Sequence, residues 1–412
     1  MKTHPWLLPW LVGGLLATSA HLGAAQAQSA LAAERPTLTQ AVEAAWQRSS
    51  EAAQSQGQRR QARAEQVVAS NWLSAPPALQ LSQREGRGNA ADGQRETEVG
   101  VALPLWRYGA RTTAGQAAQA ELDWSQAAEQ AARLRVAGQV REALGQLSGL
   151  EAEQRVASLQ SQLLARLAED VDRRVKAGDL APADALAARA ESLASQAQEA
   201  EVQVRLRAHR AQWQLLTGLA VAAQAPATAS PSFEVSDTHP EMLLATKAVE
   251  RAQKKLALVQ AQRGGGPELG VSLRQERPGQ GNPVQNSVAV ALRLPFGTEA
   301  HAQPRVAAAL AEVDLALALQ QRTRDRLTTE LGLARGQLQG AQAQARLETQ
   351  RAALLRERAT HIDKSFKAGE SPLPELLRAL SAAAQAEAAS ERQQALLGLA
   401  EARLQQAQGL LP

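Results

Sequence analysis

The chain has 412 residues and a formal net charge of +4 at pH 7, and it contains no cysteine. The missing cysteine excludes disulfides, thiolate metal ligands, cysteine nucleophiles and lipidation of an N-terminal cysteine. Aromatic residues make up only 3% of the chain, and its 45 basic and 41 acidic residues nearly balance, so nucleic-acid binding is not expected. The apolar content is mostly Ala, Leu and Val, which is typical of long, closely packed helices.

The first 27 residues have the pattern of a secretory signal peptide. Lys2 supplies positive charge, an apolar core follows over residues 6–20, and Ala25-Gln26-Ala27 fits a small-residue cleavage site. We therefore expect residues 1–27 to be removed and the protein to be exported. No later stretch reaches about 18 consecutive apolar residues, so no transmembrane helix is predicted.

Residues 28–218 are predicted to form a first structural unit. Proline and glycine bound its helical patterns, and strict alternation of apolar with polar or small residues marks a hairpin of two strands of about nine residues each. The predicted elements are a helix over about 40–73, a β-hairpin over 78–103, a long helix over 110–177 and a helix over 182–216.

A second unit with the same order of elements is predicted over 239–412, after a linker over 219–238 that is rich in Ala, Pro, Ser and Thr. Its elements are a helix over about 240–262, a β-hairpin over 268–294, a long helix ending near 368 and a last helix over about 374–409.

The two units align at one constant offset of 191 positions, which spans strand, helix and turn. The matched pairs are Pro104 with Pro295, Val99 with Val290, Asp172 with Asp363, Gly178 with Gly369 and Asp184 with Glu375. Because chance rarely keeps one register over such different elements, we interpret the pattern as an internal duplication.

The lengths of the elements indicate a membrane-linked architecture. A helix of about 68 residues spans roughly 100 Å, and tilted strands of about 9–11 residues can cross a bilayer. One face of each strand is Leu/Val and the other is polar or small. Aromatic residues flank the strand ends on the helix side, as in interfacial girdles: Trp72, Trp106, Tyr108 and Phe296.

Two amphipathic hairpins of a water-exposed protein are the alternative interpretation of this pattern. In lipid, four strands cannot close a barrel, and an open edge would leave backbone groups unsatisfied. The membrane interpretation therefore requires oligomerisation, and three copies would supply twelve strands.

The chain resembles the TolC-like family of outer-membrane efflux channels over essentially all of its predicted mature length. The resemblance rests on Leu103-Pro104-Leu105-Trp106-Arg107-Tyr108-Gly109, on Leu294-Pro295-Phe296-Gly297, and on two similar passages over 173–191 and 364–382. It implies a mainly α fold with a transmembrane β-barrel contribution: a homotrimer with a twelve-stranded barrel and a long periplasmic α-helical barrel.

The resemblance also implies a function. Such channels are passive exit ducts in the outer membrane of Gram-negative bacteria, and they dock onto a periplasmic adaptor and an inner-membrane transporter, here of the RND type. Heavy-metal cations, drugs and polypeptides are all possible cargo. A soluble periplasmic coiled-coil scaffold or adaptor is the alternative from another class, and it would explain the helices and the export but not the two hairpins.

The two similar passages correspond to the helix turns at the periplasmic tip of the family, which contact the adaptor and close the pore. The residues carried over are Val175, Gly178, Asp179, Leu180, Asp184, Phe366, Gly369, Glu370, Leu373, Glu375 and Arg378. In the family, an acid at the Glu375 position forms the constriction. Arg378 stands where a second acid is common, so a contact between Glu375 and Arg378 is an alternative. For Asp184 and Glu375, ordinary first-turn charge at a helix N-terminus is the plain explanation.

No catalytic constellation is found in the sequence. The four histidines that follow the predicted signal are isolated from one another, and no HExxH, GxSxG or Walker motif occurs. These residues are His209, His239, His301 and His361. His361 and Asp363 stand two apart on a helix, point to different faces and make a poor metal pair. The sequence therefore predicts neither an enzyme nor a bound cofactor or metal.

Overall fold

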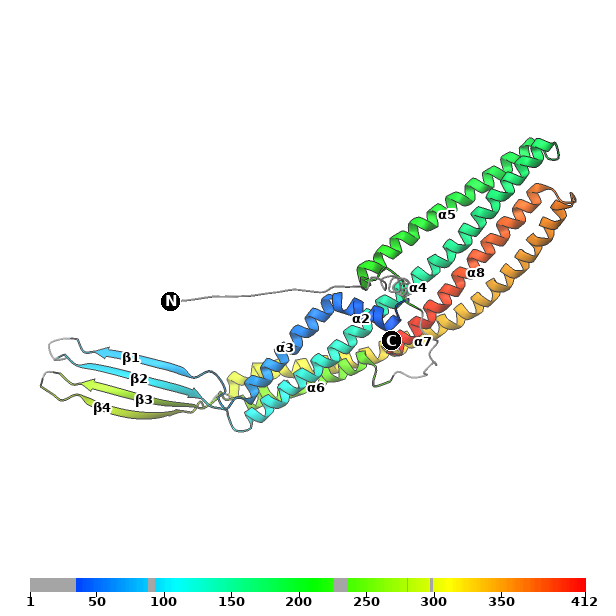
Figure 1. The fold of residues 1–412 in the computed structure, drawn as a ribbon. Helices are drawn as coiled ribbons and strands as arrows, with labels where there is room; N and C mark the ends of the chain where they lie inside the picture. The colour runs from blue at the N-terminus through cyan, green and yellow to red at the C-terminus, as the bar shows by residue number, and fades with distance from the viewer. Residues whose placement is uncertain (1–34, 88–92, 225–235, 280, 297–298) are drawn as a thin grey trace, which may run out of the picture.

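The computed structural model describes residues 35–87, 93–224, 236–279, 281–296 and 299–412. The predicted signal peptide, most of the predicted linker and Gly297 of the family motif lie outside these residues. The described chain forms one elongated body with a four-stranded sheet at one end and the turns of two helix pairs at the other (Figure 1). No helix within the described ranges combines the length and hydropathy needed to span a bilayer.

The same order of elements occurs twice along the chain. The first set follows the short helix α2 (Leu38–Arg48) and comprises two strands and three helices: α3 (Ser50–Ser70), β1 (Ala78–Glu85), β2 (Arg95–Pro104), α4 (Ala110–Ala177) and α5 (Pro182–Thr217). The second set is α6 (Pro240–Ala261), β3 (Glu268–Arg277), β4 (Gln285–Arg293), α7 (Glu299–Lys367) and α8 (Leu373–Ala407).

The prediction of a single helix over 40–73 is wrong, because α2 and α3 are separate helices. The chain is extended at Ser49, with φ −78° and ψ 148°, between them. The Ser49 hydroxyl accepts a hydrogen bond from the Ala52 amide at 3.1 Å and donates one to the Trp46 carbonyl at 2.8 Å. One serine thus satisfies an end of each helix, which offsets the loss of helical hydrogen bonds at the break.

The long helices end where glycine allows it. At the end of α4, Gly178 adopts the left-handed conformation with φ 87°, and at the end of α7 Gly369 does so with φ 81°. Residues with a Cβ rarely adopt these angles, so the two glycines stop their helices and reverse the chain.

The four strands form one antiparallel sheet in the order β1-β2-β3-β4, so the second hairpin pairs with the first through β2 and β3. A few backbone contacts connect the segments between the sheet and the helices. Leu73 bridges Leu105, the Leu105 amide donates to the Pro267 carbonyl at 2.8 Å, and the Ser74 amide donates to the Pro104 carbonyl at 3.0 Å. The segments that enter and leave the first hairpin therefore meet the one that enters the second.

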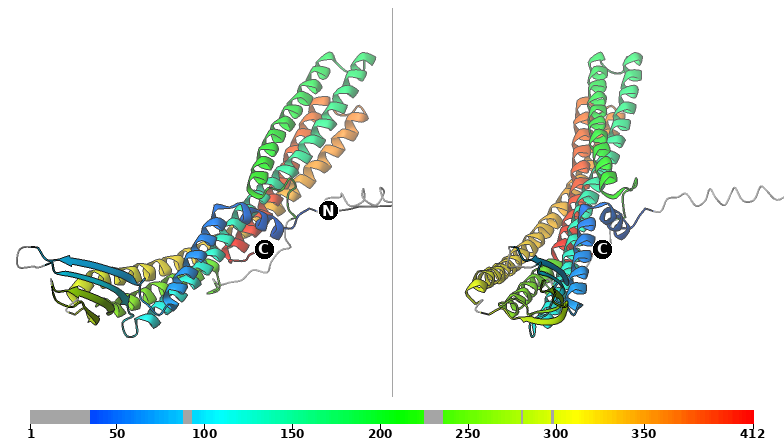
Figure 2. Two further views of the ribbon diagram at one scale, coloured as in Figure 1. Left: turned by 60° about the vertical axis from the view of Figure 1, so that its left-hand side comes forward. Right: turned by 90° about the vertical axis from the view of Figure 1, so that its left-hand side faces the viewer.

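The helices form a layer in which α4 is central and α7 lies at an edge. Among the described elements, α4 packs against α3 and α5 on one side and against α6 and α8 on the other, whereas α7 packs only against α6 and α8. Both views in Figure 2 show the α4/α5 and α7/α8 pairs running side by side towards the turns. The layer therefore has two open edges, one at α3 and α5 and the other at α7.

The two largest buried clusters of the described residues help to hold the layer together. At mid-length, Trp213, Leu147, Val140 and Trp46 lie in a cluster that joins α2, α4 and α5, and Arg133 stacks over the Trp46 ring at 4.8 Å. We call this region the waist, where α2, the start of α6 and the ends of α5 and α8 meet beside α4. The second cluster lies beside the turns and is described below.

Candidate functional site

The sheet has one continuous apolar face. Residues that are directly opposite in an antiparallel sheet share a face, and the register aligns apolar residues in rows across all four strands. The rows are Leu81, Val99, Leu273 and Val288, then Leu79, Val101, Val271 and Val290. All eight side chains are exposed in the single chain. No element among the described residues packs on this face, so it is a continuous exposed apolar patch of the kind that marks an interaction surface.

The opposite face of the sheet is polar and charged. Arg274 on β3 lies in the centre of this face and forms ion pairs with Glu96 at 2.9 Å, Glu98 at 3.3 Å and Glu276 at 3.4 Å. Ser272 donates a hydrogen bond to Glu98 at 2.6 Å. The alternation predicted from the sequence therefore separates an apolar face from a polar face in the folded sheet.

The sheet ends in two unpaired edges. Among the described residues, strand β1 pairs only with β2 and strand β4 pairs only with β3. Each outer strand therefore has a free row of backbone donors and acceptors. The strands have 8 to 10 residues each, close to the length that crosses a bilayer when tilted.

The four aromatic residues lie where the strands meet the helices. Tyr108 and Phe296 are fully or nearly fully exposed, with relative areas of 102% and 93%, and Trp72 is largely exposed. Trp106 is half-buried against the start of α4, and its ring nitrogen donates to the Asn71 carbonyl at 2.9 Å. Three of the four rings are thus available to an external surface.

At the far end of the molecule, the two helix turns are built alike. After α4 the Asp179 amide donates to the Arg174 carbonyl at 2.9 Å, and after α7 the Glu370 amide donates to the Ser365 carbonyl at 2.9 Å. In both turns the intervening glycine is left-handed, which is the Schellman arrangement. Similar sequences at an offset of 191 therefore produce similar turns.

The two turns differ in what they bury. Phe366 has 4% of its area exposed and Leu373 has 2%, whereas their equivalents Val175 and Pro182 remain at least partly exposed. Arg174 stacks over the Phe366 ring at 5.2 Å. We define the tip cluster as the buried residues Leu164, Ala168, Val171, Ala188, Phe366, Leu373, Leu376 and Leu377. It joins the two helix pairs.

The residues predicted from the resemblance therefore fall into two groups. Phe366 and Leu373 support the turns from inside. The others reach the surface wholly or in part: Val175, Gly178, Asp179, Leu180, Asp184, Gly369, Glu370, Glu375 and Arg378.

The acids that follow the turns differ in their bonding. Asp184 accepts a hydrogen bond from the Ala181 amide at 3.2 Å, so it caps the start of α5. This agrees with the explanation that Asp184 is an ordinary first-turn acid at a helix N-terminus. The alternative contact between Glu375 and Arg378 is not formed in the described structure. Instead, the Arg378 guanidinium donates to the Pro374 carbonyl at 3.1 Å. Glu375 itself is partly exposed.

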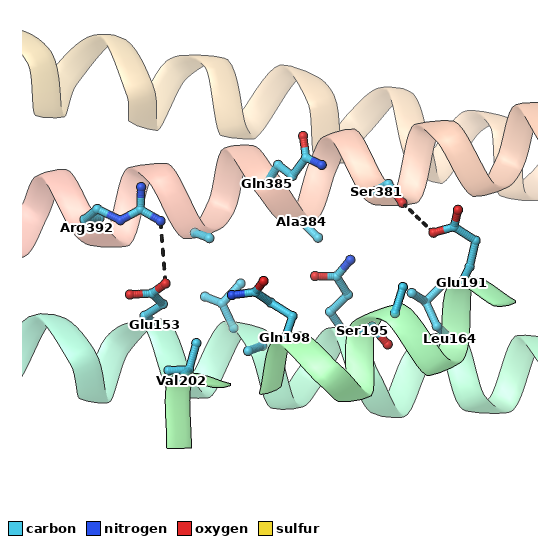
Figure 3. A pocket seen from close by; sticks show the side chains of 15 residues that line it. Glu153, Leu164, Glu191, Ser195, Gln198, Val202, Ser381, Ala384, Gln385 and Arg392 are labelled. Carbon is cyan, nitrogen blue, oxygen red and sulfur yellow. Dashed lines mark hydrogen bonds and ion pairs between the residues drawn. The ribbon is translucent and has the colours of Figure 1, made fainter. Parts of the chain in front are cut away.

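A groove between the two helix pairs could not be predicted from the sequence. It has a volume of about 460 Å³ and lies over α4, between α5 and α8. Figure 3 shows Gln198 and Ser195 on one wall and Gln385 on the other. Two polar contacts cross it: Arg392 with Glu153 at 3.6 Å and Ser381 with Glu191 at 3.5 Å. The helix pairs are therefore closely joined at the tip cluster and at the waist but only loosely between them.

The titratable groups of the described residues do not gather into a metal site. Within the described residues, no three His, Asp or Glu side chains come together in a way that could hold a metal ion. His361 Nε2 lies 3.8 Å from a carboxylate oxygen of Glu357 on the surface of α7. The exposed Arg189 guanidinium hydrogen-bonds Asp172 at 2.6 Å, and this contact raises the pKa of the arginine.

The sheet and the long helices together define the fold. A sheet with an apolar face and two free edges, joined to helices of 68 and 69 residues, is the fold of one subunit of a TolC-like outer-membrane channel. The resemblance seen in the sequence is confirmed at the level of the fold.

Solved structures of outer-membrane channels share this fold with the chain. The outer-membrane protein VceC from Vibrio cholerae matches with a TM-score of 0.72 at 18% identity, over 90% of this chain and 96% of VceC. CusC matches with 0.72 at 14% identity over 90% and 92% of the two chains, and the CmeC channel of Campylobacter jejuni with 0.70 at 14% over 90% and 85%. No protein-family model and no curated protein matches the sequence.

Proposed function

We propose that the chain is the outer-membrane channel, or exit duct, of a tripartite efflux system. The observation that carries this proposal is the apolar sheet face that runs across all four strands between two free edges. A bilayer would cover the apolar face, and neighbouring copies would satisfy the edges. The chain would then cross the outer membrane with its sheet and extend through the periplasm with its helices.

Three copies would form the working channel. Each copy contributes four strands, so a closed homotrimer has twelve, and polar side chains such as Arg274 and Glu98 would line its interior. The helical layer has matching open edges, at α3 and α5 on one side and at α7 on the other. One ring would therefore close the sheet and the helical layer at the same time.

The exit duct would act passively and would depend on partners for cargo. We propose that the turns after α4 and α7 meet a periplasmic adaptor, which connects the duct to an inner-membrane transporter of the RND type. The cargo would be small solutes such as heavy-metal cations or drugs. The similarity of the fold to solved outer-membrane channels supports the proposed role as an exit duct. The polar face of the sheet suits the passage of solutes in water.

Within this proposal, Glu375 acts as a gate residue. Its carboxylate makes no ion pair with Arg378 and lies beside the second turn. In a trimer, three such carboxylates would narrow the entrance and bind cations there. We predict that Glu375→Ala raises the single-channel conductance in a planar bilayer, because it removes both side-chain bulk and charge at the constriction.

Asp184→Ala is the matched control, because Asp184 holds the equivalent position but already caps α5 through Ala181. It should leave the conductance close to that of the natural protein. Equal conductance for the natural protein and Glu375→Ala would remove Glu375 from the gate. A protein that forms no conducting pores in either form would favour the periplasmic scaffold instead.

A further inference from the structure

His239 is a buried histidine that the exit-duct function does not use. It lies at the waist, immediately before α6, with 2% of its area exposed. Its Nδ1 accepts a hydrogen bond from the Glu241 amide at 3.1 Å, so the imidazole is the N-cap of α6. A nitrogen that accepts from an amide carries no proton. This contact indicates a neutral ring with its proton on Nε2, a buried atom that has no hydrogen-bond partner in the described structure.

The same imidazole ring packs against the C-terminal end of α8. Gly409 ends that helix in the left-handed conformation with φ 74°. A Cβ on Gly409 would lie only 2.5 Å from His239 Cδ2 and 3.0 Å from its Nε2. The glycine therefore leaves the space that the imidazole fills, and the ring has little room to rotate unless the end of α8 moves.

The end of α8 is also held by α4. The buried Arg141 donates one hydrogen bond to Gln406 at 2.7 Å and another to the Leu410 carbonyl at 2.7 Å. Gln406 in turn donates to the Leu134 carbonyl at 2.8 Å. Burial lowers the pKa of Arg141 to about 10, which still leaves it charged at neutral pH. The α4 contacts therefore do not titrate in the range where a histidine does.

We propose that His239 is a pH-sensitive latch that ties the start of α6 to the end of α8 at the waist and releases both when the imidazole is protonated. Protonation would place an N–H on Nδ1, facing the Glu241 amide, so two donors would meet and the cap would be lost. The ring would then have to turn, and its turning would displace Gly409.

The charged groups around the latch come from four helices. Glu241 on α6 and Glu330 on α7 favour the protonated ring, whereas Arg326 on α7 opposes it. Arg135 on α4 and Arg403 on α8 line the adjoining hollow of about 390 Å³. Glu241 is itself paired with Arg135 at 2.8 Å and with Arg326 at 3.6 Å, so its charge is largely balanced.

Burial is the largest influence on His239 and lowers its pKa below the usual value. Between this lowered pKa and the unfolded value near 6.5, the unfolded chain binds more protons than the folded one. The contribution of His239 to stability is therefore complete above about pH 6.5 and is lost as the pH falls through the folded pKa. The latch holds at neutral pH and opens in acid.

Amide hydrogen exchange of the full-length protein in detergent tests the latch. Between pH 7.5 and pH 5, after correction for intrinsic exchange, peptides covering 240–246 and 404–410 should exchange about fivefold faster, the size expected from losing one N-cap. His239→Asn keeps a capping side chain that does not titrate, and it should abolish this pH dependence in both peptides.

His361→Asn is the control, because His361 lies exposed on α7, and this variant should behave as the natural protein does. The latch is contradicted if the natural protein shows no acceleration in acid, or if His239→Asn shows the same acceleration. If the variant fails to fold, the absence of acceleration in the natural protein still contradicts the latch. The measurement reports the waist of the fold, so its outcome does not depend on whether the protein is a channel.

Discussion

The two long helices are duplicates in sequence but occupy different places in the molecule. Helix α4 lies between neighbours and buries 21 residues, whereas α7 lies at the edge and buries nine. The contrast is clearest at two pairs of equivalent glycines. On α4, a Cβ at Gly145 would lie 2.8 Å from Leu399, and one at Gly149 would lie 3.2 Å from the Ala395 Cβ. On α7, Gly336 and Gly340 have nothing within 4 Å of such an atom.

This difference indicates that the free edge of α7 lacks a helix to pack against. In the first half, the glycines of α4 let α8 approach closely. In the second half, the equivalent glycines Gly336 and Gly340 of α7 have no helix packed against them. By the offset of 191, the counterpart of α8 is α5, and the counterpart of Ala395 is Val204, which is exposed. If copies assemble in a ring, α5 of one copy should therefore lie on α7 of the next.

The largest predicted effect is a cross-link between copies. Because the chain has no cysteine, Gly340→Cys combined with Val204→Cys introduces a single possible pair. The equivalent approach of Gly149 to Ala395, 3.2 Å between Cβ positions, is slightly closer than the separation of about 3.5–4.5 Å in a disulfide, so a small shift of the helices would allow the bond. We expect oxidation to give covalent dimers and trimers on a non-reducing gel.

Gly115→Cys combined with Val204→Cys is the matched control, since Gly115 is also free of neighbours but lies on α4. This pair should remain monomeric on the same gel. Cross-linking of the control, or none in the test pair, would show that α5 and α7 are not neighbours across copies.

The next effect concerns the two turns. Phe366 is buried in the tip cluster, whereas the equivalent Val175 is only partly buried. Removing a buried Phe side chain costs about 3–5 kcal/mol, and trimming a partly buried Val should cost much less. Phe366→Ala should therefore expose the turns to limited proteolysis much more than Val175→Ala does. Equal sensitivity of the two variants would mean that the tip cluster does not join the two helix pairs.

The smallest effect compares the glycines directly. Gly145→Ala forces its Cβ against the buried Leu399 and should destabilise the protein by about 1–3 kcal/mol. Gly336→Ala has free space within one chain and gains helix propensity, and by the offset of 191 its neighbour across copies would be the small Ala208 instead of a leucine, so it should cost clearly less than Gly145→Ala. Thermal unfolding of the two variants in detergent measures the difference. A lower midpoint for Gly336→Ala than for Gly145→Ala would reverse the assignment of central and edge helix.

Features that depend on local patterns, such as helix bounds and hairpins, could be predicted from the sequence. The bounds of α4 follow from a pattern without proline and from the glycine that stops it, and the structure ends α4 at Ala177, directly before Gly178. Alternation likewise predicted both hairpins, because a strand with one apolar face has a period of two. The break at Ser49 was missed because a serine cap inside an amphipathic stretch leaves the apolar pattern almost unchanged.

The remaining features depend on tertiary packing and could not be predicted. Both long helices have the same pattern, so their sequences do not tell which one is central. Phe366 was predicted at a contact surface, but its burial depends on Arg174 and the helices around it. The groove over α4 and the double role of His239 arise from segments that are far apart in the chain, and no local signal marks them.

The mass of the detergent-extracted protein, taken from the outer-membrane fraction of cells that express it, tests the central claim most directly. The claim is that the free edges of the sheet and of the helical layer are closed by two further copies. We predict that the protein is found in that fraction with three times the mass of one processed chain. A soluble periplasmic monomer or dimer would contradict the account, because four unclosed strands cannot be satisfied in lipid.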